Sequence, residues 1–350
     1  MRKILVSLWI LAATLAILRA QPRSAAALEG LDPVLLIEGT ETPGKEGITL
    51  RHGRFLYQFA GEETRRRFEK EPARYAIQQD GACARMGPPA GGNPDAYYVY
   101  KGRLYIFGTQ ECYKRFVADP AKYLEEAPPP GPAPPAAARD KARVLIEKAV
   151  EAAGGAARLE SLRGYTETRA NMERTVRFPG SIRVDRRFDS RSMTQVATRD
   201  TGFTVFQGNG QRLPPSFAAY VSRQVNREAL AALRARGSAG FRAVYSGAEG
   251  SIERVAVELN GESWTLGIDS SSGRLVRLGY RDRGPEGDFG AVALTFSDFR
   301  EVNGLWLPFR AEATFNGAAE PRLSWTTQSF ALNPANLEAL FEPPQKLEDF

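Results

Sequence analysis

The sequence predicts an α+β protein in which a small duplicated ββα module precedes an antiparallel β domain that also contains helices. Three observations lead to this prediction. Residues 28–126 contain an internal repeat, residues 127–138 are rich in proline and alanine, and most of residues 139–350 alternates between apolar and polar side chains. Such alternation is typical of strands with one buried face. A proline-rich spacer cannot form a core, so it separates two folding units.

The composition is that of two ordinary globular domains. The chain has 350 residues, of which 43% are hydrophobic and 25% charged, and these values are typical of soluble proteins. The net charge is +6, but the longest basic run is three arginines at residues 65–67. Because nucleic-acid surfaces concentrate their positive charge, we expect no nucleic-acid partner. Weak attraction to an anionic membrane surface is compatible with this charge.

The N-terminus has the pattern of an export signal. Two basic residues precede an apolar run over residues 4–18, and small residues follow it. A signal peptide over residues 1–27, cleaved after Ala20 or Ala27, accounts for this pattern. The apolar run is shorter than the roughly 20 residues of a membrane-spanning helix, although an uncleaved anchor stays open as an alternative. We therefore expect a periplasmic or secreted protein.

The repeat in residues 28–126 is ordered along its length. Residues 53–59 align with residues 102–107, and the residues that follow keep a constant offset of 48. The matching pairs are Phe59 and Phe107, Glu63 and Glu111, Arg67 and Arg115, and Phe68 and Phe116. Each copy has an aromatic-rich strand entered through a glycine turn, and a short helix follows it. Two copies are too few for a solenoid, so we expect duplicated ββα units.

The two cysteines, Cys83 and Cys112, both lie in the second copy. At the offset of 48 they align with Leu35 and Thr64, so the first copy lacks both, and they behave as a pair. In an oxidising compartment a pair favours a disulfide, which would close a loop of about 30 residues and stabilise the fold by roughly 3 kcal/mol. Two thiolates also suit a soft metal ion such as copper(I), with Met86 as a thioether ligand. Free structural thiols are the third alternative.

The single histidine, His52, excludes many enzyme classes. One residue cannot form a histidine-rich metal site, and the sequence contains no Gly-x-Ser-x-Gly motif of a serine hydrolase. The carboxylates of the β domain lie in or beside predicted strands, where acidic residues commonly occupy the solvated face. We therefore predict no catalytic residues and a protein that is not an enzyme.

The second copy resembles a YHS (TRASH-type) domain. The resemblance rests on Cys-Ala-Arg-Met at residues 83–86, on Tyr-Lys-Gly-Arg-Leu-Tyr-Ile-Phe-Gly-Thr-Gln-Glu-Cys at residues 100–112, and on Phe116 and Asp-Pro-Ala-Lys-Tyr at residues 119–123. With a degenerate first copy it covers about residues 31–125. In that family, cysteines at the positions of Cys83 and Cys112 are associated with metal binding, sensing or trafficking, copper included. This chain has Gly108 where many members have a further cysteine.

The second domain begins with a predicted helix over residues 139–153, which two glycines end. A helical stretch over residues 217–236 interrupts a series of predicted strands, and Asn-Gly pairs at 260–261 and 303–304 are typical of hairpin turns. The predicted strands cover residues 176–188, 203–206, 252–259, 264–268, 275–280, 291–299, 310–315 and 323–330.

The second domain is similar to periplasmic carriers of outer-membrane lipoproteins (LolA/LolB-like). The resemblance covers about residues 140–344 and rests on short motifs at residues 152–155, 266–269, 273–276, 296–308, 333–334 and 340–341. It implies an incomplete β-barrel that wraps around helices and leaves an apolar cavity for acyl chains. The implied lining candidates are Phe206, Tyr220, Trp264, Phe296, Trp306 and Trp325.

Together these features predict an exported, non-enzymatic binding protein, in which a carrier-like domain for a lipid or another apolar ligand is joined to a YHS-like module. A lipoprotein or a membrane surface is the expected partner. The alternative is a periplasmic protein that binds or carries a soft metal such as copper through Cys83 and Cys112.

Overall fold

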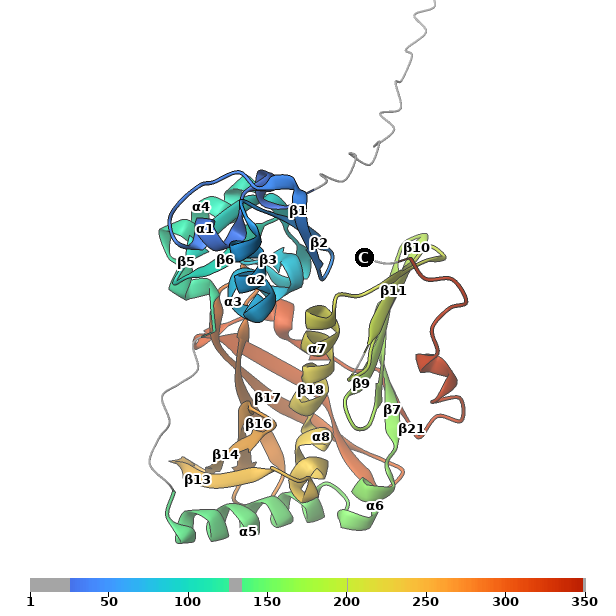
Figure 1. Ribbon diagram of the computed structural model, residues 1–350. Helices are drawn as coiled ribbons and strands as arrows, with labels where there is room; N and C mark the ends of the chain where they lie inside the picture. Colours follow the sequence, from blue (N-terminus) through green and yellow to red (C-terminus); the bar gives the residue numbers. More distant parts are fainter. Residues whose placement is uncertain (1–25, 126–133, 200, 349–350) are drawn as a thin grey trace, which may run out of the picture.

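The computed structural model describes residues 26–125, 134–199 and 201–348. These residues form an N-terminal module, residues 26–125, set against one end of a larger β domain, residues 134–348 (Figure 1). Of the predicted signal peptide, residues 1–25 lie outside the described residues. Within the described residues, no helix is long and apolar enough to cross a membrane.

The N-terminal module contains two ββα units in the same element order. The first unit follows η1 (Leu28–Gly30) and α1 (Pro33–Ile37), and consists of β1 (Lys45–His52), β2 (Phe55–Phe59), α2 (Glu62–Lys70) and α3 (Pro72–Tyr75). After η2 (Gln79–Gly81), β3 (Ala82–Cys83) and β4 (Gly87–Gly91), the second unit consists of β5 (Asn93–Tyr100), β6 (Arg103–Phe107), α4 (Gln110–Ala118) and η3 (Pro120–Tyr123). Both hairpins are antiparallel, and their turns contain glycines with positive φ, as the turn prediction requires.

One phenylalanine of the repeat anchors each unit. Phe68 and Phe116 are fully buried and make ring contacts with aromatic residues of their own hairpins. The core of the first unit also includes Ala27, whose backbone N–H donates to the carbonyl of Leu56 (2.8 Å). Ala27, the later of the two predicted cleavage positions, is therefore part of this core.

The β domain contains two antiparallel sheets. The first has the order β12-β11-β10-β9-β8-β7-β21, and the second has the order β13-β14-β15-β16-β17-β18-β19, with β20 also paired to β18. The strands of the first sheet are β7 (Gly164–Arg169), β8 (Met172–Arg177), β9 (Ser181–Phe188), β10 (Arg191–Ala197), β11 (Gly202–Phe206), β12 (Asn209–Arg212) and β21 (Ser329–Leu332). Those of the second are β13 (Arg242–Glu249), β14 (Ile252–Leu259), β15 (Glu262–Asp269), β16 (Leu275–Arg283), β17 (Phe289–Val302), β18 (Leu305–Phe315), β19 (Ala318–Ala319) and β20 (Trp325–Thr326).

The two sheets are joined where the chain passes from β20 to β21. The N–H of Thr327 donates to Phe309 of β18 (2.8 Å), and the N–H of Gln328 donates to Thr168 of β7 (2.8 Å). In the described residues, β12 and β13 are not paired with each other, so the sheets do not close into a barrel. The predicted α+β class, with mostly antiparallel sheets and a few helices, is confirmed.

Helices cover the inner faces of the sheets. They are α5 (Ala136–Ala152), which packs along β13, α6 (Ala156–Ser161), α7 (Pro215–Arg223), η4 (Gln224–Arg227), α8 (Ala229–Arg234) and η5 (Ala235–Gly237). Figure 1 shows α7 and α8 between the two sheets. Val221, Leu230 and Leu233 from these helices share one core with the inner residues of both sheets. Short 3-10 turns at η6 (Pro321–Leu323) and η7 (Ala339–Phe341) complete the domain.

Several predicted segments differ from the structure. The predicted strand over residues 323–330 is divided between the end of η6, β20 and the start of β21. The predicted spacer 127–138 overlaps α5, which begins at Ala136, because a run of alanines after Pro135 favours helix from its first residue. The segment 176–188 forms parts of two strands, because Pro179 and Gly180 make the turn between β8 and β9.

Candidate functional site

A cavity of about 300 Å³ lies between the two sheets. One wall comes from β7, β8 and β9, the opposite wall comes from β16 and β17, and α7 and η4 cover one side. The lining residues are Arg169, Met172, Arg174, Val184, Arg186, Tyr220, Gln224, Arg227, Glu228, Tyr280, Asp282, Arg283, Val292, Leu294, Arg322, Leu323 and Trp325. The cavity therefore combines an apolar wall with six arginines.

Buried ion pairs fix part of this wall. Glu167 is 2% exposed and accepts bonds from Arg169 (2.8 Å to each oxygen) and from Arg174 (3.1 Å), and Thr327 donates a further bond to it. Burial alone would raise the pKa of Glu167, but Arg169 and Arg174 outweigh burial and lower it. This carboxylate therefore stays ionised and holds both guanidinium groups in place.

A second set of pairs lies on the helical side of the cavity. Arg174 also pairs with Glu228, which accepts a bond from the hydroxyl of Tyr165 (3.2 Å). Arg227 pairs with Asp282, and its guanidinium lies 4.5 Å from the centre of the Tyr280 ring. The carboxylates that line the cavity are therefore already bound to arginines.

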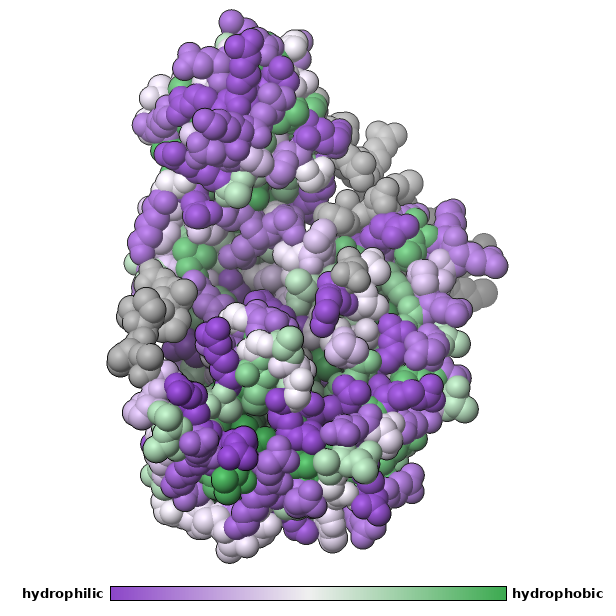
Figure 2. All heavy atoms as spheres, turned by 60° about the horizontal axis from the view of Figure 1, so that its bottom comes forward, coloured by the Kyte–Doolittle hydropathy of each residue, from purple (hydrophilic) through white to green (hydrophobic). Residues whose placement is uncertain are grey.

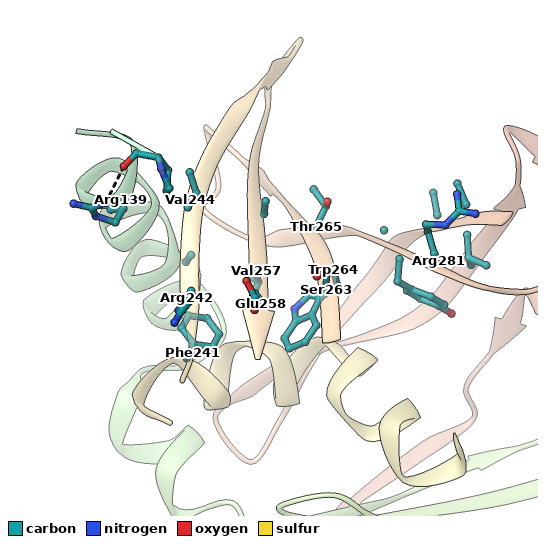
Figure 3. Close-up of a pocket in the computed structure, with 18 residues that line it drawn as sticks. Arg139, Phe241, Arg242, Val244, Val257, Glu258, Ser263, Trp264, Thr265 and Arg281 are labelled. Carbon is teal, nitrogen blue, oxygen red and sulfur yellow. Dashed lines mark hydrogen bonds between the residues drawn. The ribbon is translucent and has the colours of Figure 1, made fainter. Parts of the chain in front are cut away.

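A wider groove of about 1220 Å³ runs along β13 to β17 (Figure 3). Its exposed strand residues, Ala256, Glu258 and Ser263, alternate with core residues such as Val257 and Trp264. Because adjacent residues of a strand point to opposite faces, this groove lies on the outer, solvated face of the sheet. Figure 3 also shows Arg139 at the start of α5, where it donates to the carbonyl of Pro134 (2.8 Å) at one end of the groove.

The six predicted lining residues do not meet around one cavity. Tyr220 and Trp325 line the inner cavity, whereas Trp264 and Phe296 are buried in the common core. Trp306 lines a small crevice of about 20 Å³ beside α5 and α8. Phe206 is 42% exposed near the end of β11. The register of each strand, which aromatic composition alone does not reveal, decides these positions.

Cys83 and Cys112 form a second candidate site. The structure has both as buried free thiols that interact with each other, and not as the disulfide that the sequence favours. Burial raises the pKa of Cys83, although backbone N–H groups of Gly108, Met86 and Arg85 donate to its sulfur and oppose this effect. Burial also acts to raise the pKa of Cys112, but hydrogen bonds from Thr109 and Arg85 outweigh it and lower that pKa.

The surroundings of the pair favour negative charge on Cys112. Cys112 lies in the first turn of α4, whose cap is Thr109, and a helix N-terminus favours negative charge. Three backbone N–H groups surround the sulfur of Cys83. Of the two thiols, Cys112 is therefore the more acidic, because its pKa is lowered while that of Cys83 is raised.

The first unit has a carboxylate in the equivalent place. Asp32 is fully buried and accepts bonds from the N–H groups two and three residues later (2.9 and 3.2 Å), from the N–H of Ala60 (2.8 Å) and from the hydroxyl of Thr64 (2.6 Å). Cys83 likewise accepts from N–H groups two and three residues later and from Gly108, the counterpart of Ala60. The structural counterpart of Cys83 is therefore Asp32 and not Leu35, because the first copy has three more residues before β2 ends.

The thiol pair also lies close to the contact between the module and the β domain. Arg283 of β16 donates to the carbonyl of Arg85 (2.7 Å), and Glu286 pairs with Arg85 (3.5 Å). The thioether of Met86 lies beside Gly287 of the same loop. Further along the contact, the N–H of Ser216 donates to Asp80 (2.8 Å). Figure 2 shows the mostly hydrophilic module above the β domain, with a hollow between the two.

In the described residues, no group of three or more His, Cys, Asp or Glu side chains could hold a metal ion. Two adjacent sulfurs nevertheless fit the two-coordinate preference of a soft monovalent ion. The sequence predicted that the two cysteines form a pair, and the two thiols interact in the structure. It did not identify the arginine-lined cavity. The one sequence feature that pointed to this cavity was the high density of arginines at residues 169–187. In the sequence alone, such a cluster is typical of an ordinary solvated strand face.

No family model matches the chain, and no curated protein matches it. Among solved structures, the chain is similar to a LolA superfamily protein from Nitrosomonas europaea. The two share 13% sequence identity and a TM-score of 0.34, and the similarity covers 55% of this chain and 93% of that one.

Proposed function

We propose that this protein is an exported binding protein that holds an apolar or amphipathic ligand, such as a lipid, in the inner cavity of its β domain. The proposal rests on the cavity between β9 and β17. Its volume of about 300 Å³ is at the lower end of the range of small-molecule sites, and its wall combines apolar side chains with a few polar ones. The export pattern of the N-terminal sequence supports a location in the periplasm or outside the cell.

The ionic groups of the cavity support binding and not catalysis. Glu167 is held by two arginines, Glu228 by Arg174 and Asp282 by Arg227. A general base needs a carboxylate that is able to accept a proton near neutral pH. The lowered pKa of Glu167 makes it a poor base. The three ion-paired carboxylates instead shape the wall.

Filling the cavity is expected to weaken ligand binding. Met172 lines the cavity and is only partly buried, so Met172→Trp should occupy the space without unfolding the domain. We expect it to weaken the binding of an uncharged fluorescent probe, N-phenyl-1-naphthylamine, by about tenfold or more in a fluorescence titration.

The matched control is Glu173→Trp. Glu173 is the next residue of β8, and its side chain points to the opposite face. Equal binding by the wild-type protein and the Glu173→Trp variant, together with loss in Met172→Trp, supports the proposal. If the wild-type protein binds no probe, or if both variants bind like the wild type, the inner cavity is not the binding site.

The thiol pair supports a second candidate function, the binding of one copper(I) ion by Cys83 and Cys112. The supporting observation is that the two sulfurs interact with each other and that the surroundings of Cys112 lower the pKa of its thiol. In competition with bicinchoninate, the wild-type protein should retain one copper(I) per chain, and Cys112→Ser should retain none. Thr64→Ser changes the equivalent position of the first unit and should retain copper(I). A wild-type protein that retains no copper(I) would exclude this function.

A further inference from the structure

Arg186 differs from the other arginines of the inner cavity in its contacts. Arg169, Arg174, Arg227 and Arg322 each pair with a carboxylate, and Arg283 donates to the carbonyl oxygens of Arg85 and Gly287 (2.7 and 2.9 Å). Across residues 26–125, 134–199 and 201–348, the Arg186 guanidinium has no hydrogen bond or ion pair. It lies on β9, and its side chain lines the cavity.

The electrostatic surroundings of Arg186 favour an added anion. Partial burial, and then the positive charges of Arg174 and Arg169, lower the pKa of Arg186. Partial burial of a guanidinium group without a counter-ion costs free energy, and a bound anion would offset that cost. Its planar fork of donors matches a carboxylate or a phosphate group.

Apolar side chains surround this charge. Phe188 follows Arg186 at a spacing of two on the same strand, so both point to one face. The strand register places Met172 and Met193 directly opposite Arg186 and places Phe206 opposite Met193, all on that face. Among the described residues, three large apolar side chains are exposed, Val144, Phe188 and Phe206. Two of these three, Phe188 and Phe206, lie on the same face as Arg186. The apolar wall of the cavity therefore continues into an exposed apolar surface beside the charge, which we call the ledge and which consists of Met172, Phe188 and Phe206.

We infer that Arg186 binds the anionic head of an amphiphile, a carboxylate or a phosphate carried on an alkyl chain. This inference rests on the proposed function, because the chain of the ligand would occupy the inner cavity or the ledge formed by Met172, Phe188 and Phe206. The cavity has room for about ten water-sized groups, so a single medium-length chain fits it better than a large lipid. The charge and the apolar surface lie side by side, as such a ligand requires.

Isothermal titration calorimetry with four probes tests this inference. The probes are decanoate, decyl phosphate, 1-decanol and inorganic phosphate, and the protein is the full mature chain. We expect the wild-type protein to bind decanoate or decyl phosphate about tenfold or more tightly than 1-decanol. It should bind inorganic phosphate weakly, because phosphate lacks the alkyl chain.

Arg186→Gln should remove the preference for the charged probes, so that decanoate and decyl phosphate bind no more tightly than 1-decanol. Arg186→Lys keeps the charge without the planar fork and should retain part of the preference, and it serves as the test if the glutamine variant does not fold. The matched control is Arg187→Gln, because Arg187 is exposed on the opposite face of the same strand. That variant should behave like the wild type.

Four results would overturn the inference. Decanoate and decyl phosphate that both bind no more tightly than 1-decanol, or an unchanged preference in Arg186→Gln, would show that Arg186 does not select the ligand while the proposed function stands. Inorganic phosphate that binds as tightly as decyl phosphate would identify a simple anion site. If none of the alkyl probes binds, 1-decanol included, the proposed function itself fails and the inference fails with it.

Discussion

Replacement of Glu167 by glutamine should lower the free energy of unfolding by about 3–5 kcal/mol. Glu167 is 2% exposed and is the common partner of Arg169, Arg174 and Thr327. Glutamine keeps the shape of the side chain but removes its negative charge. Two largely buried guanidinium groups would then lose a counter-ion, although Arg174 keeps Glu228. Chemical denaturation followed by circular dichroism measures the loss.

The control for this prediction is Glu173→Gln on the neighbouring strand. Among the described residues, Glu173 has no ion pair, so its replacement should change stability by less than about 0.5 kcal/mol. The difference between the wild type and Glu167→Gln should also depend on pH. Because the folded-state pKa of Glu167 is lowered, the stabilisation is fully present above the unfolded value of about 4.3 and is lost as the pH falls through the folded-state pKa. A loss below 1 kcal/mol at neutral pH would contradict a structural role for Glu167.

Replacement of Asp32 by alanine is expected to destabilise the N-terminal module by about 3 kcal/mol or more. Three backbone N–H groups and the hydroxyl of Thr64 would lose their acceptor in a site with no exposed surface. Each buried donor left without a partner costs about 1–3 kcal/mol. The effect is measured by thermal unfolding of the purified full-length variant and wild type. Near-ultraviolet circular dichroism, to which the aromatic-rich module contributes, monitors the transition.

Asp119→Ala is the matched control, because Asp119 is an exposed aspartate at the end of α4 in the same module. Its replacement should leave the transition nearly unchanged. Similar transitions for Asp32→Ala and the wild type would mean that the polar contacts of Asp32 do not hold the first unit together. The equivalence of Asp32 and Cys83 would then lose its structural basis.

Local patterns in the sequence predicted much of the fold. The glycine turns, the repeat and the Asn-Gly pairs act within a few residues, so the hairpins at 260–261 and 303–304 could be located without a structure. The constant offset of the repeat failed only where the two copies differ in length, and it therefore aligned Cys83 with Leu35 in place of Asp32.

The inner cavity could not be predicted in the same way, because distant segments meet there. Glu167 and Thr327 are 160 residues apart, and Arg174 and Glu228 are 54 residues apart. Only the pairing of the sheets brings these residues together. In the sequence, each arginine stands among polar neighbours and resembles a solvated residue. The same reason explains why the predicted aromatic residues divide between the core, the cavity and the rim of the sheet.

The most direct test of the proposed function is a crystal structure of the protein with 10-bromodecanoate, because bromine can be located by its anomalous scattering. The proposed function and the role of Arg186 predict a bromine peak against the apolar surface formed by Met172, Val184 and Leu294 or by the adjoining ledge, with the carboxylate at Arg186. A bromine peak confined to the outer groove along β13 to β17, or no bound ligand at concentrations that saturate the titration, would contradict a ligand site between the two sheets.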